Sequence, residues 1–275
     1  MEKIQLVSSD LNGTLVHQHT MMDMIRVGFP HEPERFETAK DAFSKQTDGR
    51  LSMEKAFEIA GPLTKGLPLR TVIEYTLSEM RFLNGFEAFI RTLHKQNIFF
   101  IINSTGYGIT TEVIKAVYGP QYFYDVICNR LVFENHGKIV EEAELSGWVK
   151  NYVRGDRRNS IYDDILAAGT VELGIRNENE KARLLFEMTD RLNIPRTAVV
   201  HIGDTMGDSG GICGVARNGG IGIAFNYNEA LRTFIEDVLK NERISGKLLM
   251  ISPKSESSDI RDILRYLTKA SGNFP

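Results

Sequence analysis

Four side chains that could build a phosphate and metal site are spread across this sequence, close to the boundaries of expected elements. Asp10, Ser104 and Asp204 each come shortly after a β-rich or apolar run, and Lys181 begins a helical pattern. Carboxylate oxygens are the ligands that Mg²⁺ prefers, and a hydroxyl beside glycines together with a lysine can hold phosphoryl oxygens. The residue types therefore predict a site for a phosphate group and a hard divalent cation.

The elements that must position these side chains alternate along the chain. Short apolar runs predict strands at residues 3–7, 98–102, 125–132, 198–202, 221–225 and 248–251. Apolar spacing of three and four predicts helices at residues 87–95, 113–118, 181–193, 229–241 and 259–269. This alternation predicts an α/β fold with a doubly wound, Rossmann-like parallel sheet. Ligands of such sheets bind at the carboxyl ends of the strands, which is where the candidate residues are expected.

One long segment interrupts the alternation. Residues 17–80 contain helical patterns at 33–45 and 52–59, separated by glycines and prolines, and no strand pattern. We therefore expect residues 17–80 to form a helical cap over the strand ends, with 1–16 and 81–275 forming the α/β core. Residues 141–179 are charged and have no clear period, so their structure and role are not predicted.

Composition excludes several classes of protein. With 42% hydrophobic and 25% charged residues, the chain is typical of globular proteins, and its net charge of −3 gives no bias toward nucleic acid or anionic membranes. No apolar run approaches the roughly 20 residues of a membrane span. The N-terminus becomes polar within ten residues, which predicts no signal peptide and a cytoplasmic location. Cys128 and Cys213 match no metal or disulfide pattern, and nothing determines the oligomeric state.

Four segments, in order, resemble the motifs of the haloacid dehalogenase superfamily. Asp10–Thr14 (Asp-Leu-Asn-Gly-Thr) resembles the first motif, and Ile101–Gly106 the second. Lys181 matches the lysine of the third motif, and Gly203–Asp208 (Gly-Asp-Thr-Met-Gly-Asp) matches the fourth. Three further features resemble the phosphoserine phosphatase branch of this superfamily. They are Cys128–Leu131 followed by Gly137-Lys138, the segment Gly222–Asn226, and the position of the insert.

The resemblance implies a Mg²⁺-dependent phosphatase of a small phosphorylated metabolite that forms an aspartyl-phosphate on Asp10. It assigns catalytic roles to Asp10, Asn12, Ser104 and Lys181. It assigns phosphate binding to Asp10, Gly13, Ser104, Thr105, Gly106 and Lys181. The metal would be held by Asp10, the backbone carbonyl of Asn12, Asp204 and Asp208, the last either as a ligand or through a neighbouring group. Lys181 could instead be a solvated charge, with Arg183 in its place, and His201 is expected in the core.

Asn12 departs from the family pattern, which has a second aspartate at this position. That aspartate protonates the leaving group, and an amide has no titratable proton for this step. Three alternatives remain open: a substrate whose leaving group needs little protonation, a proton from His17 or His19, or a weak or inactive phosphate-binding protein. Another hydrolase or a phosphotransferase that uses the same site is a further alternative. Among these, a phosphonatase would need a cap lysine, for which the candidates are Lys40, Lys45, Lys55 and Lys65.

Substrate specificity is expected to depend on the cap. Phosphoserine phosphatases have an acidic residue soon after the first motif, and Val16–Thr20 contains none, which argues against phosphoserine as the substrate. Arg50, Arg70 and Arg81 are the candidates for binding a carboxylate or a second phosphate of the substrate.

Overall fold

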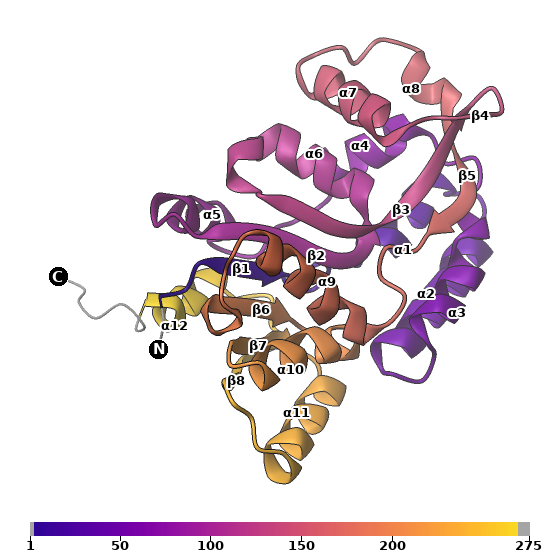
Figure 1. Cartoon of the computed structure of the whole chain (residues 1–275). Coiled ribbons are helices and arrows are strands. Elements are labelled where there is room, and N and C mark those ends of the chain that lie inside the picture. The colour runs from indigo at the N-terminus through magenta and orange to yellow at the C-terminus, as the bar shows by residue number, and fades with distance from the viewer. Residues whose placement is uncertain (1–2, 269–275) are drawn as a thin grey trace.

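The computed structural model describes residues 3–268 and has one eight-stranded sheet in the order β4-β3-β2-β1-β6-β7-β8, with β5 also paired to β3 (Figure 1). The strands are β1 (Leu6–Ser9), β2 (Phe99–Tyr107), β3 (Asp125–Asn135), β4 (Lys138–Ile139), β5 (Ile165–Glu172), β6 (Val199–Gly203), β7 (Ile221–Tyr227) and β8 (Lys247–Pro253). From β3 to β8 along this order neighbouring strands are parallel, whereas β4 and β5 pair antiparallel with β3. The doubly wound α/β fold is confirmed.

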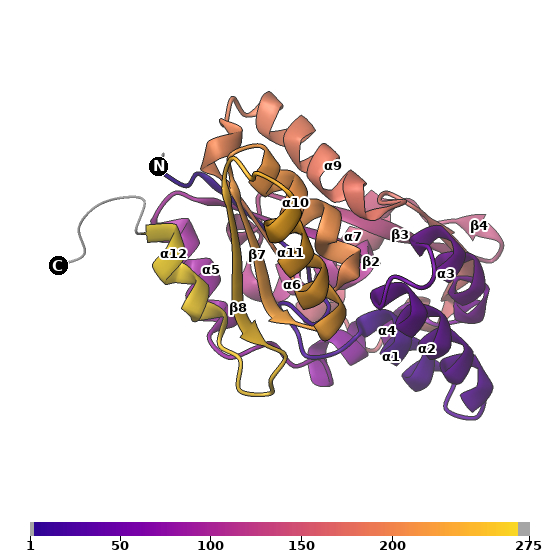
Figure 2. The same ribbon diagram turned by 90° about the horizontal axis from the view of Figure 1, so that it is seen from below.

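Strand order reverses at β1, which lies between β2 and β6. All four residues of β1 are buried, because helices cover both faces of the sheet. Val7 belongs to the apolar cluster that includes α5 (Phe86–Lys95) and α12 (Leu264–Thr268), and Leu6 to the cluster that includes α9 (Glu178–Arg191). Figure 2 shows α5 and α12 on one side of the sheet and α9, α10 (Ser209–Arg217) and α11 (Glu229–Asn241) on the other. The reversal creates the crevice where a ligand site is expected.

The segment between β1 and β2 is helical, as its sequence predicts. Its helices before α5 are α1 (Thr20–Gly28), α2 (Pro33–Thr47), α3 (Met53–Ala60) and α4 (Leu69–Ser78). The expected start of α3 is confirmed, because the Ser52 hydroxyl accepts a hydrogen bond from the Lys55 N–H at 3.3 Å. The division of the chain into a core and a cap at residues 17 and 80 stays a prediction.

Residues 141–179, which had no sequence interpretation, contain α7 (Glu142–Val153), the short α8 (Ile161–Asp164) and β5. Their apolar side chains join one cluster with those of α1 to α4, and this cluster is separate from the one around β1. In Figure 1, α7 and α8 lie beside β3, β4 and β5, on the same side of the molecule as α4. This segment therefore packs with the helical insert, although it follows the second motif in sequence.

Several expected elements are shorter than the observed ones or differ from them in type. The strand expected at 98–102 continues to Tyr107, because the polar residues of the second motif stay paired with β3 through a shift in register. Helix 113–118 begins earlier, at Gly108, in α6 (Gly108–Tyr118). Helix 259–269 is a 3-10 turn at Ile260–Ile263 followed by α12, and residue 269 lies outside the described residues.

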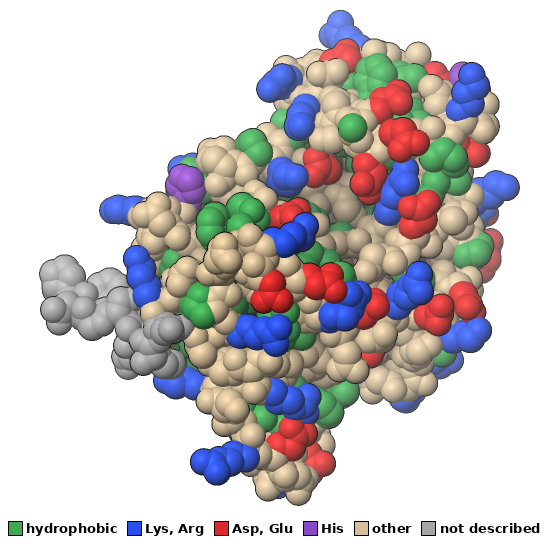
Figure 3. Space-filling view, viewed as in Figure 1, with side chains coloured by type: hydrophobic (Ala, Val, Ile, Leu, Met, Phe, Trp, Pro, Cys, Tyr) green, Lys and Arg blue, Asp and Glu red, His purple; other side chains and the backbone are tan. Residues whose placement is uncertain are grey.

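The surface of the described residues shows no single-sign charge patch on the face drawn in Figure 3, where acidic and basic side chains are interspersed. No described helix combines the length and apolar character needed to cross a membrane.

Candidate active site

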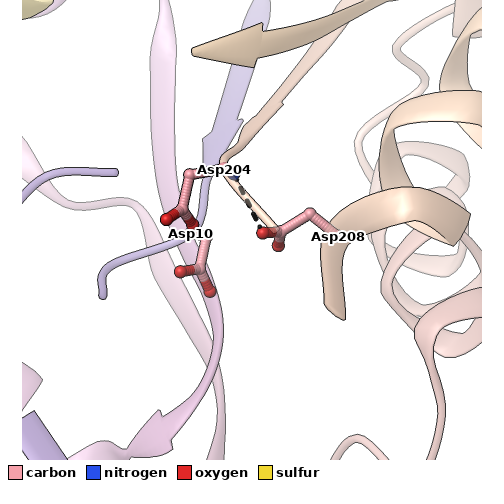
Figure 4. Close-up of side chains that lie close together, drawn as sticks. All are labelled: Asp10, Asp204 and Asp208. Atoms are coloured by element: carbon pink, nitrogen blue, oxygen red, sulfur yellow. Dashed lines mark hydrogen bonds between the residues drawn. The ribbon is translucent and has the colours of Figure 1, made fainter. Parts of the chain in front are cut away.

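The site lies at the reversal of strand order, where β1 and β6 end. Asp10 follows β1 and Asp204 follows β6, and both face a cavity of about 410 Å³. Carboxylate oxygens of Asp10, Asp204 and Asp208 lie within 4.8 Å of one another (Figure 4). To share an ion, the carboxylates of Asp10 and Asp204 must lie within about 8 Å of each other. Their expected proximity is confirmed.

Lys181 belongs to α9, and its side chain extends to the carboxylates of Asp10 and Asp208. Its side chain is 1% exposed, and its ammonium donates to Asp10 Oδ1 at 2.9 Å and to Asp208 Oδ1. Asn103 Nδ2 donates to the Lys181 carbonyl at 3.0 Å, which ties the start of α9 to β2. The alternative interpretation of Lys181 as a surface charge is wrong, and Arg183 forms ion pairs on the exposed face of α9.

Asp208 organises the turn after β6. Its Oδ2 accepts the backbone N–H groups of Asp204 at 3.1 Å and of Thr205 at 3.3 Å, and Oδ1 accepts from Lys181. Thr205 completes a capping box with Asp208, so the turn is held from both ends. Asp208 therefore acts as a brace for the turn and for the lysine.

Asp204 is fixed by the loop that follows Asp10. Thr14 Oγ1 donates to Asp204 Oδ1 at 3.1 Å. Gly13 has φ +76°, and a Cβ at that position would lie 2.0 Å from Asp204 Oδ2. Glycine is required there both by the backbone conformation and by the close approach of the carboxylate.

Burial and like charges raise the pKa values of the carboxylates. Burial and the Asp208 charge raise the pKa of Asp10 to about 6, against the opposing effect of Lys181. Burial, Asp208 and Asp10 raise the pKa of Asp204 well above its ordinary value. Burial opposes the charge of Lys181, but Asp10 and Asp208 outweigh it and raise the pKa of the ammonium. The lysine stays charged, and the carboxylates repel one another.

Asn12 links the loop after β1 to the first helix of the insert. Its Oδ1 accepts both the backbone N–H of Thr20 at 2.9 Å and the Thr20 hydroxyl at 2.8 Å. Asn12 lines the cavity, as do Gly13 and Thr105. With its oxygen occupied by two donors, the side chain has only its NH₂ group left for a ligand.

The second motif, Ile101–Gly106, lies mostly beneath the surface of the cavity. Ser104 is fully buried, its Oγ accepts the Gly106 N–H at 3.0 Å, and a hydrogen bond with Ser104 opposes the rise in the pKa of Asp10. Thr105 is the member of this motif that lines the cavity. Ser104 and Gly106 thus contact the site from beneath the cavity surface.

The opposite wall comes from the insert and from the loop after β8. The insert contributes residues before and within α1 and at the end of α2, namely His17, Gln18, His19, Met22, Ser44, Gln46, Thr47 and Asp48. Burial lowers the pKa of His19 to about 4, and its ring packs on Phe43 with centroids 4.8 Å apart. His17 lies 3.7 Å from Glu256.

The three arginines considered as substrate-binding residues all have protein partners and are outside the cavity lining. Arg50 bonds to Asp48 at 2.7 Å, and Arg70 bonds to Asp163 at 2.7 and 2.9 Å. Arg81 lies 3.5 Å from Glu256. Asn228 and Lys254 line the cavity instead, and sequence reasoning missed both. The resemblance of Gly222–Asn226 to a phosphatase segment was the available signal, since these residues lead directly to Asn228.

His201 lies inside the core, as expected. It is fully buried in β6, its Nδ1 shares a hydrogen bond of 3.0 Å with the Ser8 hydroxyl, and burial lowers its pKa to about 3. The imidazole is therefore neutral and does not face the cavity.

Comparison with known proteins places this geometry in context. The family model described as haloacid dehalogenase-like hydrolase matches residues 7–162. A phosphoserine phosphatase from Archaeoglobus fulgidus is 24% identical over 246 residues, which make up 88% of this chain and 58% of the relative. This chain thus spans less than two thirds of that curated protein.

Solved structures with a similar fold include phosphoserine phosphatases. A phospho-aspartyl intermediate analogue of phosphoserine phosphatase is similar with a TM-score of 0.67 and 22% identity, over 96% of this chain and 99% of that chain. A substrate-bound phosphoserine phosphatase complex has a TM-score of 0.67 and 21% identity, over 97% and 99% of the two chains. At these identities the likeness concerns the fold, and it agrees with the branch that the motifs resemble.

Proposed function

This chain belongs to the haloacid dehalogenase-like hydrolases, and we propose that within this family it is a Mg²⁺-dependent phosphatase of a small phosphorylated metabolite. The observation that supports this most is the position of Asp10. Its carboxylate faces a cavity of about 410 Å³, bonds to Lys181 at 2.9 Å, and lies among carboxylate oxygens within 4.8 Å of one another. Such an arrangement serves nucleophilic attack on phosphorus.

The residues at the strand ends fit a magnesium ion. The donors are all oxygens, and the raised pKa values of Asp10 and Asp204 reflect burial and, next to it, repulsion between carboxylates that a cation would relieve. We propose that Asp10, Asp204 and the backbone carbonyl of Asn12 hold the ion. Asp208 is occupied by Lys181 and two backbone N–H groups, so it supports the ligands from behind. When bound, Mg²⁺ supplies positive charge to the phosphoryl oxygens and orients the group.

The reaction proceeds in two displacements at phosphorus. An Asp10 carboxylate oxygen forms a bond to phosphorus while the bond to the leaving oxygen breaks, with its electron pair remaining on that oxygen. Lys181 and the backbone N–H groups near Gly13 and Thr105 bind the equatorial oxygens, whose charge they offset. Water then attacks phosphorus, which releases phosphate and restores the Asp10 carboxylate.

Proton transfer to the leaving group is the step for which this chain lacks the aspartate of the family, because position 12 is an asparagine. Asn12 cannot donate a titratable proton, and its oxygen is held by Thr20. His19 is neutral at pH 7, because burial lowers its pKa to about 4, so it carries no acidic proton there. We therefore propose that the substrates are those with weakly basic leaving groups, such as aryl or acyl phosphates, unless His17 provides the proton.

The test compares the native chain with Asn12→Asp on an aryl and an alkyl phosphate. An aspartate at position 12 can accept both Thr20 bonds, so the substitution should leave the fold intact, which thermal unfolding would verify. Alkyl phosphatase activity should rise by about 100-fold or more in Asn12→Asp, the usual contribution of a positioned acid. Mass spectrometry should detect a longer-lived phosphorylated Asp10 in the native chain, and Asp10→Asn serves as the inactive control.

The outcome distinguishes the remaining alternatives. Equal native rates on aryl and alkyl phosphates would show that another group, with His17 the first candidate, supplies the proton. No turnover of either substrate by the native chain, with activity in Asn12→Asp, would show a phosphate-binding protein. The four lysines considered for a phosphonatase do not line the described cavity, and Lys40, Lys45 and Lys55 pair with acidic residues on their own helices. No observation therefore favours that activity.

A further inference from the structure

Lys254 lines the active-site cavity and lies in the loop directly after β8. Its backbone N–H donates to the Tyr227 carbonyl at 3.1 Å, which fixes it beside the end of β7. Among the described residues no carboxylate forms an ion pair with its ammonium. Glu256, two residues on, lies near His17 and Arg81 instead.

The loop that carries Lys254 is built into the catalytic centre through a buried asparagine. Asn226 is 2% exposed, and its Nδ2 donates to the Gly13 carbonyl at 2.6 Å. Its Oδ1 accepts the Ser255 N–H at 2.8 Å and the Ser258 hydroxyl at 2.9 Å. One side chain therefore joins the loop after β8 to the loop after β1. The position of Lys254 is therefore tied to the loop that carries Asp10, although the two residues are 244 positions apart in sequence.

The charge of Lys254 also reaches His19 across the cavity, where it adds to the effect of burial, the larger cause, in lowering the pKa of that imidazole. The cavity's other described cation, Lys181, already has two carboxylate partners. Asp48, the carboxylate on the insert side, is bonded to Arg50. Lys254 is thus the cation of the described cavity that has no carboxylate partner.

We propose that Lys254 binds a second anionic group of the substrate, a carboxylate or a second phosphate, and so determines specificity. This inference rests on the proposed phosphatase function and names the substrate class: a small phosphomonoester with another negative charge. Lys181 and the metal site would take the phosphoryl group that reacts. Thr47 and Asn228 also line the cavity and offer neutral polar groups to a substrate.

The experiment uses two matched pairs of probes in the presence of Mg²⁺. 3-Phosphoglycerate and glycerol 3-phosphate differ in a carboxylate against a hydroxymethyl group, and fructose 1,6-bisphosphate and fructose 1-phosphate differ in a second phosphate. For each pair the ratio of kcat/KM is measured in the Asn12→Asp background, where alkyl phosphates should be turned over, with Lys254 unchanged, Lys254→Met or Lys254→Arg; the ratio with Lys254 unchanged is the native ratio. The matched control is Lys247→Met, an exposed lysine at the opposite end of the same strand.

The native ratio should favour the doubly anionic member of one pair by about tenfold, a typical value for a charge-assisted bond at a partly exposed site. Lys254→Met should reduce that ratio to near 1, mainly through KM, and Lys254→Arg should retain part of it. Lys247→Met should keep the native ratio. The pair that shows the effect distinguishes a carboxylate from a second phosphate. A native ratio near 1 in both pairs, or a ratio unchanged in Lys254→Met, would overturn the inference.

A binding measurement separates this inference from the proposed function. Calorimetry with Asp10→Asn, which cannot form the phosphoryl enzyme, measures the dissociation constants of the same four probes without turnover. A preference for the doubly anionic probe that disappears in Asp10→Asn/Lys254→Met would support Lys254 as the binding residue even if the native chain hydrolysed nothing. Hydrolysis of aryl phosphates without any such preference in binding would support the phosphatase and refute the role of Lys254.

Discussion

The two walls of the cavity differ in how their polar groups are held. On the core wall, Asp10 and Asp208 are buried and each accepts a hydrogen bond from the buried Lys181, and Asp204 is held by Thr14. On the opposite wall, the side chains of the insert range from buried, as at Gln46, to exposed, as at Ser44, and the exposed Lys254 lies with them. A preorganised wall suits a reaction centre, where charges must be in place before the substrate arrives. An adaptable wall suits selection among substrates.

The largest expected effect comes from removing the lysine that binds the core wall together. Lys181→Met would leave Asp10 and Asp208 as buried carboxylates without their cation. Loss of one partner of a buried ion pair costs about 3–5 kcal/mol of stability. Urea unfolding of the metal-free proteins should show this loss, and Lys247→Met, at an exposed site, should stay within about 0.5 kcal/mol of the native chain. Equal stability of the two variants would mean that the core wall does not depend on the lysine.

The next largest effect concerns the contact between Gly13, in the loop after β1, and Asp204, at the end of β6. Gly13→Ala would place a Cβ 2.0 Å from Asp204 Oδ2 and strain a residue with φ +76°. Displacement of a metal ligand or its support lowers affinity about 10- to 100-fold, so Mg²⁺ binding measured by calorimetry should weaken by that factor. Gly137→Ala is the matched control, because Gly137 has φ +77° and nothing within 4 Å. It should reproduce the backbone strain without the loss of affinity.

The core wall was predictable because its residues lie in short, contiguous motifs. Each motif spans five residues or fewer, from Asp10 to Gly13 and from Asp204 to Asp208. These residues can therefore be recognised from their spacing without knowledge of the packing. Lys181 was less certain, because Glu178 and Glu180 beside it make a solvated surface charge a reasonable alternative. Its burial depends on how α9 packs against β2, which no local pattern encodes.

The opposite wall could not be predicted because its members meet only through long-range packing. Lys254 reaches the cavity through the bridge from Asn226 to Gly13, and that contact joins residues 213 positions apart. Arg70 was a candidate for substrate binding because it lies in the expected cap, yet its partner is Asp163 in a segment without readable periodicity. Residues 165–172 form β5 by antiparallel pairing with the far half of β3, and this long-range partner determines its structure.

A smaller effect should distinguish the walls by pH. The raised pKa of Asp10, about 6, means that protonation favours the metal-free folded chain, and that this contribution is lost as the pH rises through 6. Mg²⁺ competes with those protons, so it should stabilise the chain more at pH 7.5 than at pH 5. One proton at pH 5 lowers the apparent affinity about tenfold, or about 1.4 kcal/mol. At a fixed, saturating Mg²⁺ concentration the increase in Tm should be about 3 °C greater at pH 7.5. The Asp204→Asn variant should show little increase at either pH, and a native increase independent of pH would contradict the assignment.

The smallest expected effect tests whether the segment at 142–164 belongs with the insert side of the molecule. Arg70 in α4 donates to both oxygens of Asp163 in α8, and also to the Arg157 and Asn159 carbonyls. The guanidinium therefore joins α4 to the loop between α7 and α8. Its side chain is 22% exposed, so solvent screening limits the pair, and Arg70→Met should lower stability by about 1 kcal/mol.

The location of that loss matters more than its size. Amide hydrogen exchange should become faster in α4, α7 and α8, because these helices share one apolar cluster, and should stay unchanged in β1 and β6. Arg232→Met is the control, since Arg232 pairs with Glu229 and Glu236 within its own helix and joins no separate elements. Faster exchange at the strand ends in Arg70→Met would show that the two walls unfold together, and the contrast between a rigid and an adaptable wall would then not hold. Exchange confined to the α4, α7 and α8 side would show that the adaptable wall rests on a unit that can open while Asp10, Lys181 and Asp208 stay in place.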